Sequence, residues 1–321
     1  MSETKTITIL TPVFNEEESL GQYVQQVRSV IFERPGAAED GLEYRVLFIE
    51  DGSRDKSWAM IRDICREDPR FSGIRLSRNF GSHMAITAGF DHAEGDAVCT
   101  LACDLQDPPQ TVLEFTREWL AGARIVWGKR RTRKDAGWRM ATSRIFFELL
   151  RRFAMPRGSK FTTGSFLMVD KTVVECLRKF RESNRITFAL VAWTGFDQTT
   201  VEYDRQVRFA GKSGWTFTRM IKTFYDAFIS FSSIPVRLIT WLGMCVSFAS
   251  LIFLIYLVFN WFSGTPMPGW TSTMLAMTCF FGLQFLVLGI IGEYLQRIHS
   301  ESLGRPLYFV SESTNAQRRH G

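Results

Sequence analysis

Residues 100–109 read TLACDLQDPP, a stretch in which an apolar strand ends on polar side chains and two prolines follow. Asp104 and Gln106 both carry side-chain oxygen atoms, and Mg²⁺ and Mn²⁺ prefer oxygen ligands in proteins. Such an ion keeps some of its coordination positions for water and substrate phosphates. The stretch therefore predicts a divalent metal site that receives a diphosphate. The alternative is an ordinary strand followed by an Asp-Pro turn, and the neighbouring segments decide between the two.

The segments around this stretch alternate between strand and helix patterns. Strands are expected at 6–11, 44–49, 73–76, 97–102 and 125–128, and helices at 57–66, 84–92 and 111–121. Asn15 is expected to cap one more helix, because three glutamates follow it in what would be the first turn. Alternating strands and helices predict an α/β fold with a mostly parallel sheet that is covered on both faces.

Ligands of such sheets bind beyond the carboxyl ends of the strands. Polar residues follow four of the expected strands, at 12–16, 50–55, 104–107 and 129–131. We expect these four segments to converge on one crevice. The first strand is not followed by Gly-x-Gly-x-x-Gly, and the chain has no Walker loop, which argues against a dinucleotide-binding Rossmann site or a P-loop.

Two later segments, 238–262 and 270–291, contain no Asp, Glu, Lys or Arg. Each is long enough to cross a bilayer as a helix, which favours a transmembrane hairpin over a pair of buried core helices. The basic residues around the pair are Arg219, Lys222 and Arg237 before it and Arg297 and Arg305 after it. Because positive charge stays on the cytoplasmic side, both termini are expected in the cytoplasm.

The middle of the chain carries basic and amphipathic segments. Residues 215–231 place apolar side chains at helical spacing beside basic ones, which favours a helix in the membrane interface over a core helix. The net charge is +6, and its basic residues cluster near the predicted spans, so anionic lipid is the expected partner and nucleic acid is not. The six cysteines lack zinc-type spacing and are expected to be reduced.

Several motifs together resemble the family 2 glycosyltransferases of GT-A fold. They are TPVFNEE at 11–17, EDGSRD at 50–55, RNFG at 78–81, AG at 88–89 and DLQDPP at 104–109. The most similar branch acts on polyprenyl phosphates and includes bactoprenol glucosyltransferases and dolichol-phosphate mannose synthase. The resemblance continues through the apolar segments to GEYLQRI at 292–298.

The resemblance implies an α/β fold with a GT-A, Rossmann-like, mostly parallel sheet, followed by an interfacial helix and a two-helix transmembrane hairpin. On this reading the chain has four parts. They are a cytoplasmic GT-A domain at 1–210, the interfacial helix at 211–236, the two spans at 237–295 and a cytoplasmic tail at 296–321.

Roles for individual residues are also implied by the resemblance. Asp104 and Gln106 would bind Mg²⁺ or Mn²⁺, and the ion would bridge the diphosphate of the donor. Arg130 follows the strand that is expected to end at Gly128, where the family has an arginine near nucleotide and acceptor, although a solvated basic face explains it equally well. Asp51 would read the base of the nucleotide. The other residues around the nucleoside would be Pro12, Phe14 and Glu16.

This chain departs from the family pattern in three places. Ala102 replaces the first aspartate of the usual Asp-x-Asp motif, so the nucleotide contacts of Ala102 and Cys103 are expected to be weaker while the metal ligand remains. Ser165 stands where bactoprenol enzymes have a proposed catalytic aspartate. The late basic motif supplies Arg208, but its lysine has moved to Lys212, which is expected to reach the diphosphate from a loop.

The implied activity is an inverting transfer of one sugar from a nucleoside diphosphate, with UDP-glucose as the expected donor, to undecaprenyl phosphate for modification of cell-envelope glycans. A phosphate acceptor is mostly dianionic at neutral pH, so Ser165 at the catalytic position is compatible with activity. The protein is expected in the inner membrane with its catalytic domain in the cytoplasm. A flippase and further copies of the chain are the expected protein partners.

Two other functions stay open. A degenerate protein would bind nucleotide sugar or support a flippase without turnover, as Ala102 and Ser165 could indicate. A processive polysaccharide synthase shares the fold and the metal motif, but it normally carries Gln-x-x-Arg-Trp and more membrane spans, and this chain has neither.

Overall fold

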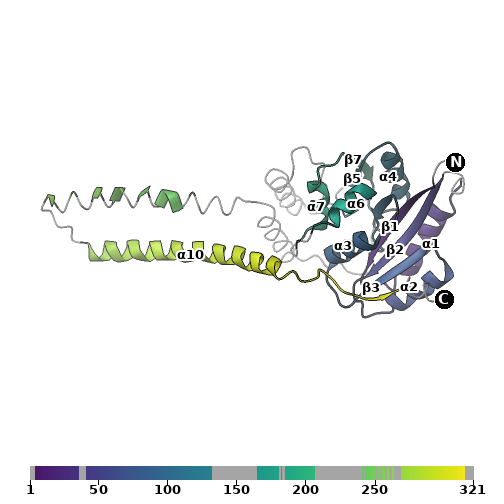
Figure 1. Ribbon diagram of the computed structural model, residues 1–321, viewed down its shortest axis with the longest axis horizontal. Helices are drawn as coiled ribbons and strands as arrows, with labels where there is room; N and C mark the ends of the chain where they lie inside the picture. Colours follow the sequence, from purple (N-terminus) through teal and green to yellow (C-terminus); the bar gives the residue numbers. More distant parts are fainter. Residues whose placement is uncertain are drawn as a thin grey trace. The chain divides into compact units, whose positions relative to one another are not determined.

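The computed structural model describes residues 4–35, 41–131, 165–180, 182, 185–206 and 269–314, with scattered residues between 241 and 263. The chain forms two compact units. The first combines Met1–Phe228 with Pro306–Gly321, and the second is Ile229–Arg305. The first unit therefore takes in the two ends of the chain (Figure 1).

The described part of the first unit contains a sheet of eight strands in the order β7-β5-β6-β4-β1-β2-β3-β8. Parallel pairs join β4, β1, β2 and β3 in the centre, and β5 and β7 also pair in parallel. Only β6 and β8 pair antiparallel with their neighbours, so the predicted mostly parallel α/β sheet is confirmed. The strands are β1 (Lys5–Val13), β2 (Leu42–Glu50), β3 (Phe71–Leu76), β4 (Ala97–Thr100), β5 (Ile125–Arg130), β6 (Leu167–Asp170), β7 (Gln198–Tyr203) and β8 (Val310–Ser313).

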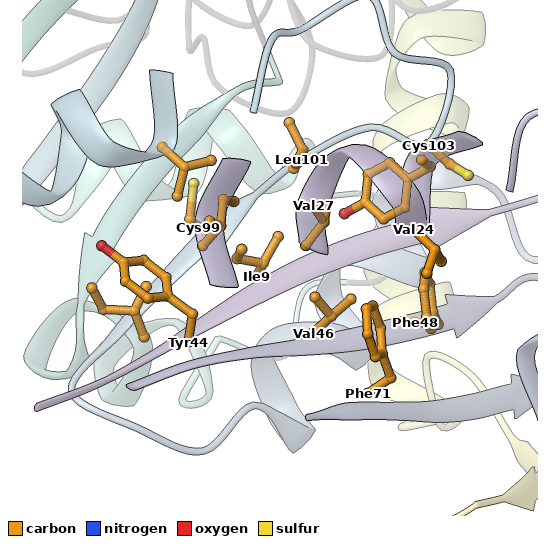
Figure 2. Close-up of a cluster of buried hydrophobic side chains, with 14 of the residues drawn as sticks. Ile9, Val24, Val27, Tyr44, Val46, Phe48, Phe71, Cys99, Leu101 and Cys103 are labelled. Carbon is orange, nitrogen blue, oxygen red and sulfur yellow. The ribbon is translucent and has the colours of Figure 1, made fainter. Parts of the chain in front are cut away.

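Helices cover both faces of this sheet. The described helices of the first unit are α1 (Leu20–Val27), the π-helix η1 (Arg28–Phe32), α2 (Ser57–Glu67), α3 (Ser82–His92), α4 (Gln110–Leu120), α6 (Lys171–Leu177) and α7 (Thr187–Trp193). Tyr23 of α1, Ile61 of α2 and Phe115 of α4 belong to one buried cluster with Ile7 and Ile9 of β1. Figure 2 shows part of this cluster, in which side chains from several strands meet those of α1.

The opposite face carries α3. Successive side chains of a strand point to opposite faces, so Leu10 lies across the sheet from Ile9. A Cβ placed on Gly89 would lie 1.9 Å from Cδ1 of Leu10. Glycine therefore lets α3 pack closely against β1, and β1 is buried on both faces, as expected for a central parallel strand.

The first helix begins later than the sequence predicts. Asn15 does not cap it, because Asn15 has a φ of 54° and its Oδ1 accepts a hydrogen bond from the main-chain N–H of Arg54 at 3.0 Å. The N-cap is Ser19, and α1 starts at Leu20. The asparagine joins two loops instead of starting a helix, and the prediction is wrong at this point.

The carboxyl-terminal part of the chain returns to the first unit. β8 pairs antiparallel with β3, and Thr314 exchanges two hydrogen bonds of 2.9 Å with Gly73, one through its Oγ1 and one through its N–H. The sequence predicts a tail at 296–321, and β8 is not among the predicted elements.

The described part of the second unit is dominated by α10 (Trp270–Ser302), which contains the uncharged segment 270–291. Within the described residues, no helix has the length and apolarity that crossing a membrane requires. The transmembrane hairpin is thus not confirmed. The predicted interfacial helix at 215–231, and much of the first predicted span, lie outside the described residues.

Candidate functional site

Loops at the carboxyl ends of β1 and β2 are joined by side chains that bond main-chain groups. The main-chain N–H of Asn15 donates to Oγ of Ser53 at 2.9 Å, and the N–H of Glu16 donates to Oγ of Ser57 at 3.0 Å. The main-chain N–H of Asp51 donates to the carbonyl of Val13 at 2.9 Å. These contacts hold the two polar segments against each other, as expected for strand ends that share one edge.

Asp51 connects these loops to the one that follows β3. Its carboxylate accepts hydrogen bonds from the main-chain N–H of Phe80 at 2.7 Å and of Gly81 at 2.9 Å. The side chain is buried, and burial raises the pKa of Asp51 while the two hydrogen bonds partly offset this rise. Asp51 is therefore an anchor of the loop at 79–81. Its predicted role in reading the base stays a prediction.

Gly52 allows the same two loops to approach closely. It has a φ of 68°, and a Cβ at this position would lie 2.4 Å from the carbonyl carbon of Arg78. Both the backbone conformation and the contact exclude a larger residue. The backbone conformation and the close contact of Gly52 therefore explain why a glycine follows Asp51 after β2.

A cleft of about 700 Å³ opens beside these loops. Phe14 lies on it with 44% of its surface exposed. Cations and hydroxyl groups from the ends of β2 and β3 line the rest, together with two residues of β8. The lining includes Ser53, Arg54, Ser77, Arg78, Asn79, Ser311 and Glu312. An exposed aromatic face beside polar and cationic groups suits a nucleotide.

Asp104 and Gln106 follow β4 at the same edge. Asp104 is buried, and its Oδ1 accepts a hydrogen bond from the main-chain N–H of Gln106 at 3.2 Å. Leu105 between them has a φ of 57°, a conformation that few non-glycine residues adopt. This turn brings the two predicted metal ligands close together.

The chemistry of these two residues fits a hard divalent cation. A carboxylate and an amide oxygen are suitable ligands, but the described residues contain no group of three or more His, Cys, Asp or Glu that could hold an ion alone. Substrate phosphates and water would have to complete the coordination. Oε1 of Gln106 accepts a hydrogen bond from Nη2 of Arg205, so an ion would compete with this arginine for the oxygen.

A second carboxylate of this stretch was not recognised from the sequence. Asp107 is buried, and its Oδ1 accepts a hydrogen bond of 2.6 Å from the hydroxyl of Tyr203. Nε of Arg130 lies 3.4 Å from the same hydroxyl. Burial raises the pKa of Asp107, and the Tyr203 bond and the charges of Arg130 and Arg205 partly offset this rise. The network brings the predicted Arg130 to the loop that carries the predicted metal ligands.

The sequence signals for this network differ. An aspartate directly before two prolines marked Asp107 as part of a turn, but nothing in the pattern indicated its burial. Tyr203 ends β7 and Arg205 follows it, and no sequence motif singled out either residue. Their contacts depend on the pairing of β5 with β7, which brings distant segments together.

The loop after β1 also meets the loop after β4. Oγ of Ser19 donates to Oε2 of Glu16 at 2.5 Å and lies 3.9 Å from Sγ of Cys103. The Cys103 thiol is buried in the hydrophobic cluster, and burial raises its pKa (Figure 2). Only the main chain of Cys103 is therefore left for the predicted contact with nucleotide.

The other predicted site residues are placed as follows. Pro12 pairs with Ile49 inside the sheet. Ala102 is half-buried at the end of β4. Ser165 is exposed, and its carbonyl accepts a hydrogen bond from Oγ1 of Thr100 at 2.5 Å. Arg208 and Lys212 lie outside the described residues.

Comparison with known proteins agrees with these motifs. Residues 8–178 match glycosyl transferase family 2. The chain is 34% identical over 321 residues to the uncharacterized glycosyltransferase YkcC of Bacillus subtilis, with 99% of this chain and 97% of YkcC covered. It is 31% identical over 309 residues to the SfII prophage-derived bactoprenol glucosyl transferase of Shigella flexneri, with 96% and 98% covered.

Among solved structures, mannosyl-3-phosphoglycerate synthase from Rubrobacter xylanophilus is similar with a TM-score of 0.49 and 16% identity, and 75% of each chain is covered. This likeness is too distant to bear on function. The family match and the full-length relatives are sufficient without it. The chain belongs to glycosyl transferase family 2 and is a glycosyltransferase, as its motifs predicted.

Proposed function

We propose that this glycosyltransferase moves one sugar from a nucleoside diphosphate to a polyprenyl phosphate. The observation that carries the proposal is the loop after β4, where the buried Asp104 lies beside Gln106, Arg205 bonds Gln106, and Arg130 lies near Asp107. One carboxylate for a metal and two cations for phosphate groups suit a diphosphate. The bactoprenol glucosyl transferase relatives, at 31% identity over nearly the whole chain, support a polyprenyl phosphate acceptor and a glucosyl donor such as UDP-glucose.

The metal would be held by Asp104 and by Gln106 once Arg205 has released it. A bound Mg²⁺ or Mn²⁺ would offset the negative charge that develops on the departing diphosphate. Phe14 and the cleft beside it would take the nucleoside. Arg130, held by Tyr203 and Asp107, would face the phosphates.

The acceptor needs no strong base. A phosphate monoester has a second pKa near 6, so at neutral pH it is mostly dianionic and nucleophilic. One of its oxygens would form a bond to the anomeric carbon as the bond from that carbon to the diphosphate breaks, with inversion. Ser165 is exposed near the end of β4. Because the acceptor is already deprotonated, Ser165 is not required to act as a base.

The proposal includes a location at the cytoplasmic face of the cell membrane. A lipid acceptor requires the site to reach the bilayer surface. The uncharged segments 238–262 and 270–291 support two spans, and the exposed aromatic side chains Phe280, Phe281 and Phe285 of α10 support contact with lipid. A flippase that moves the product across the membrane and further copies of this chain are the proposed protein partners.

The first test is transfer by the purified protein from labelled nucleotide sugars to undecaprenyl phosphate. Asp104→Asn keeps a hydrogen-bond acceptor for Gln106 but loses the charge, so we expect the rate to fall by about two orders of magnitude or more. Ser165→Ala should change it little. Initial rates at saturating donor are the measurement, with melting temperature as the folding control.

Three outcomes would contradict parts of the proposal. No lipid-extractable label with any donor of a broad panel would refute the transfer, and nucleotide binding without transfer would favour the degenerate binding protein. A product that grows in mass with time would favour a polysaccharide synthase. A loss for Ser165→Ala as large as that for Asp104→Asn would refute a mechanism without a base.

A further inference from the structure

The carboxyl-terminal strand contributes to the cleft that carries Phe14. Ser311 and Glu312 of β8 line the same cleft of about 700 Å³ as Phe14 and Arg78. More than 200 residues of the chain separate the two β8 residues from Phe14 and from Arg78. β8 lies beside β3 at the edge of the sheet. The side chains of β8 are polar or exposed and contribute little to the hydrophobic core. Packing in the core therefore does not explain why β8 lies on the cleft.

A chain of charged contacts fixes β8 at this place. Oε2 of Glu312 accepts a hydrogen bond from Nε1 of Trp58 at 2.9 Å, and its Oε1 accepts one from Nη1 of Arg75 at 3.0 Å. Nε of Arg75 in turn donates to Oε2 of the fully buried Glu50 at 3.0 Å. Arg75 therefore bridges two carboxylates, one from the sheet interior and one from β8.

The contacts of Glu50 extend this chain to the cleft loop. Its Oε1 accepts a hydrogen bond from the main-chain N–H of Ser53, which lines the cleft. The bonds to Trp58 and Arg75 hold the pKa of Glu312 below its usual range, so its carboxylate is ionised at neutral pH. The position of the loop after β2 is thus linked to an ionised side chain of β8.

The residue just before β8 contacts the loop after β3, which also lines the cleft. The main-chain N–H of Ser77 donates to the carbonyl of Phe309 at 2.9 Å, and the ring of Phe309 lies 6.4 Å from that of Phe80. Phe80 belongs to the loop whose N–H groups Asp51 holds. Residues 309–312 therefore contact the loop after β3 directly, and they are linked to the loop after β2 through Arg75 and Glu50.

We propose that Ser311 and Glu312 of β8 form one wall of the donor site, with Ser311 at the edge that receives the nucleoside and Glu312 holding Arg75 and the loop of Ser53 in position. This inference rests on the proposed function, because it names the ligand of the cleft as the nucleoside of the sugar donor. The Ser311 hydroxyl donates to the carbonyl of Arg75 at 3.2 Å and can still accept a hydrogen bond, and it lies on the same cleft as the exposed Phe14. Such an arrangement places a base between an aromatic ring and hydrogen-bonding groups.

Nucleotide binding to the full-length protein in detergent tests this assignment. The probes are uridine diphosphate and guanosine diphosphate with Mn²⁺, titrated by calorimetry. Ser311→Trp fills the cleft from β8 and should weaken the affinity for the preferred nucleotide by about tenfold or more, which corresponds to about 1.4 kcal/mol. Val310→Trp is the matched control, because Val310 is an exposed neighbour on the same strand that does not line the cleft. It should change the affinity by less than about twofold.

Glu312→Gln is the second variant. It keeps the shape of the side chain but loses the charge that holds Arg75, and we expect it to weaken nucleotide binding severalfold. Melting temperatures of all variants separate a change in the cleft from a loss of folding. Transfer activity is not needed for any of these measurements.

The outcomes distinguish this inference from the proposed function. A wild-type protein that binds neither nucleotide would refute the donor site as a whole. If the wild type binds but Ser311→Trp binds as tightly as Val310→Trp, the wall is refuted and the proposed function stands. Equal weakening by both tryptophans would show that β8 acts only through stability, and this would also overturn the inference.

Discussion

The amide oxygen of Gln106 has two possible partners. It accepts a hydrogen bond from Arg205, whereas metal binding requires the same oxygen to face a cation. The loop is held on the other side by the main-chain N–H of Gln206, which donates to the carbonyl of Gln106 at 2.9 Å. Arg205 thus bonds a proposed metal ligand and brings a positive charge close to the proposed place of the ion.

Removal of this arginine should therefore strengthen metal binding. In Arg205→Ala the Gln106 oxygen is available and a repulsive charge is gone, so we expect the affinity for Mn²⁺ in the absence of nucleotide to rise severalfold. Electron paramagnetic resonance of free Mn²⁺ measures it directly. The reason is electrostatic as well as geometric, since like charges at short range oppose binding in a partly buried site.

Arg131→Ala serves as the control. Arg131 lies at the end of the same pair of strands and contacts Asp204 at 3.5 Å, but Gln106 does not bond it in the described part of the chain. Its removal subtracts the same charge and should change Mn²⁺ affinity much less. An unchanged or weaker affinity in Arg205→Ala would show that the arginine does not compete with the ion.

At the scale of elements, α3 and α7 form a contact that depends on a neutral histidine. The ring of His83 packs edge-on against Phe188 of α7 at 5.7 Å, and the His83 carbonyl accepts a hydrogen bond from Oγ1 of Thr187 at 3.0 Å. Burial, with a smaller contribution from the positive charge of Arg185, lowers the pKa of His83 to about 4. Protonation of this ring therefore opposes folding.

The pH dependence follows from this shift. An unfolded histidine titrates near 6.5, so between about pH 6.5 and 4 the unfolded chain binds more protons and stability falls as the pH falls. The loss from His83 is at most about 3 kcal/mol. In His83→Gln this part of the loss should disappear. Melting temperatures of both proteins from pH 7 to 5 measure it, and the buried carboxylates Asp51 and Asp107, whose pKa values are raised, are the same in both proteins. Equal slopes in both proteins would contradict the assignment.

The central strands were predictable because the local sequence of each one indicates its burial. β1, β2 and β4 are buried along most of their length and are rich in apolar and β-branched residues, which is the pattern expected of strands that are covered on both faces. β8 was not predictable. Its four residues, VSES, are mostly exposed and have no apolar pattern, and the strand forms only because β3 offers an unpaired edge.

Much the same contrast holds for the candidate site. The positions of Asp104, Gln106 and Phe14 at one edge of the sheet could be predicted because these residues follow apolar strands in recognisable motifs, while their roles stay predictions. Asp107 shares a stretch with Asp104, but its bond to Tyr203 depends on the alignment of distant strands. The segment after β1 was misread for a related reason: Asn15 bonds the loop after β2, a contact that a local capping pattern does not contain.

At the scale of the whole molecule, the chain leaves the sheet unit and later returns to it. The second unit, Ile229–Arg305, is inserted between two segments of the first. The contacts that hold β8 join it to Trp58, Gly73 and Arg75, all within the first unit. The first unit should consequently be able to fold without the insertion, provided that both of its segments are present.

An internal deletion tests this organisation. Residues 229–305 are replaced by a flexible Gly-Ser linker of about 20 residues, whose root-mean-square length of about 25 Å allows the returning segment to find β3. We expect a folded protein that binds nucleotide with the affinity of the full chain, because the cleft and its β8 wall are retained. Transfer to undecaprenyl phosphate in vesicles should be lost, since the proposed lipid-contacting helices are absent. Calorimetry, thermal melting and extraction of labelled lipid are the three measurements.

A chain that ends at residue 228 provides the comparison. It lacks the linker and the returning strand, so the edge of β3 stays unpaired and Glu312 no longer holds Arg75. It should melt at a lower temperature and bind nucleotide more weakly than the linked protein. Equal behaviour of the two proteins would show that the returning segment contributes neither to the sheet nor to the cleft. An unfolded linked protein would show instead that the first unit requires the second, because every contact of β8 is preserved in it.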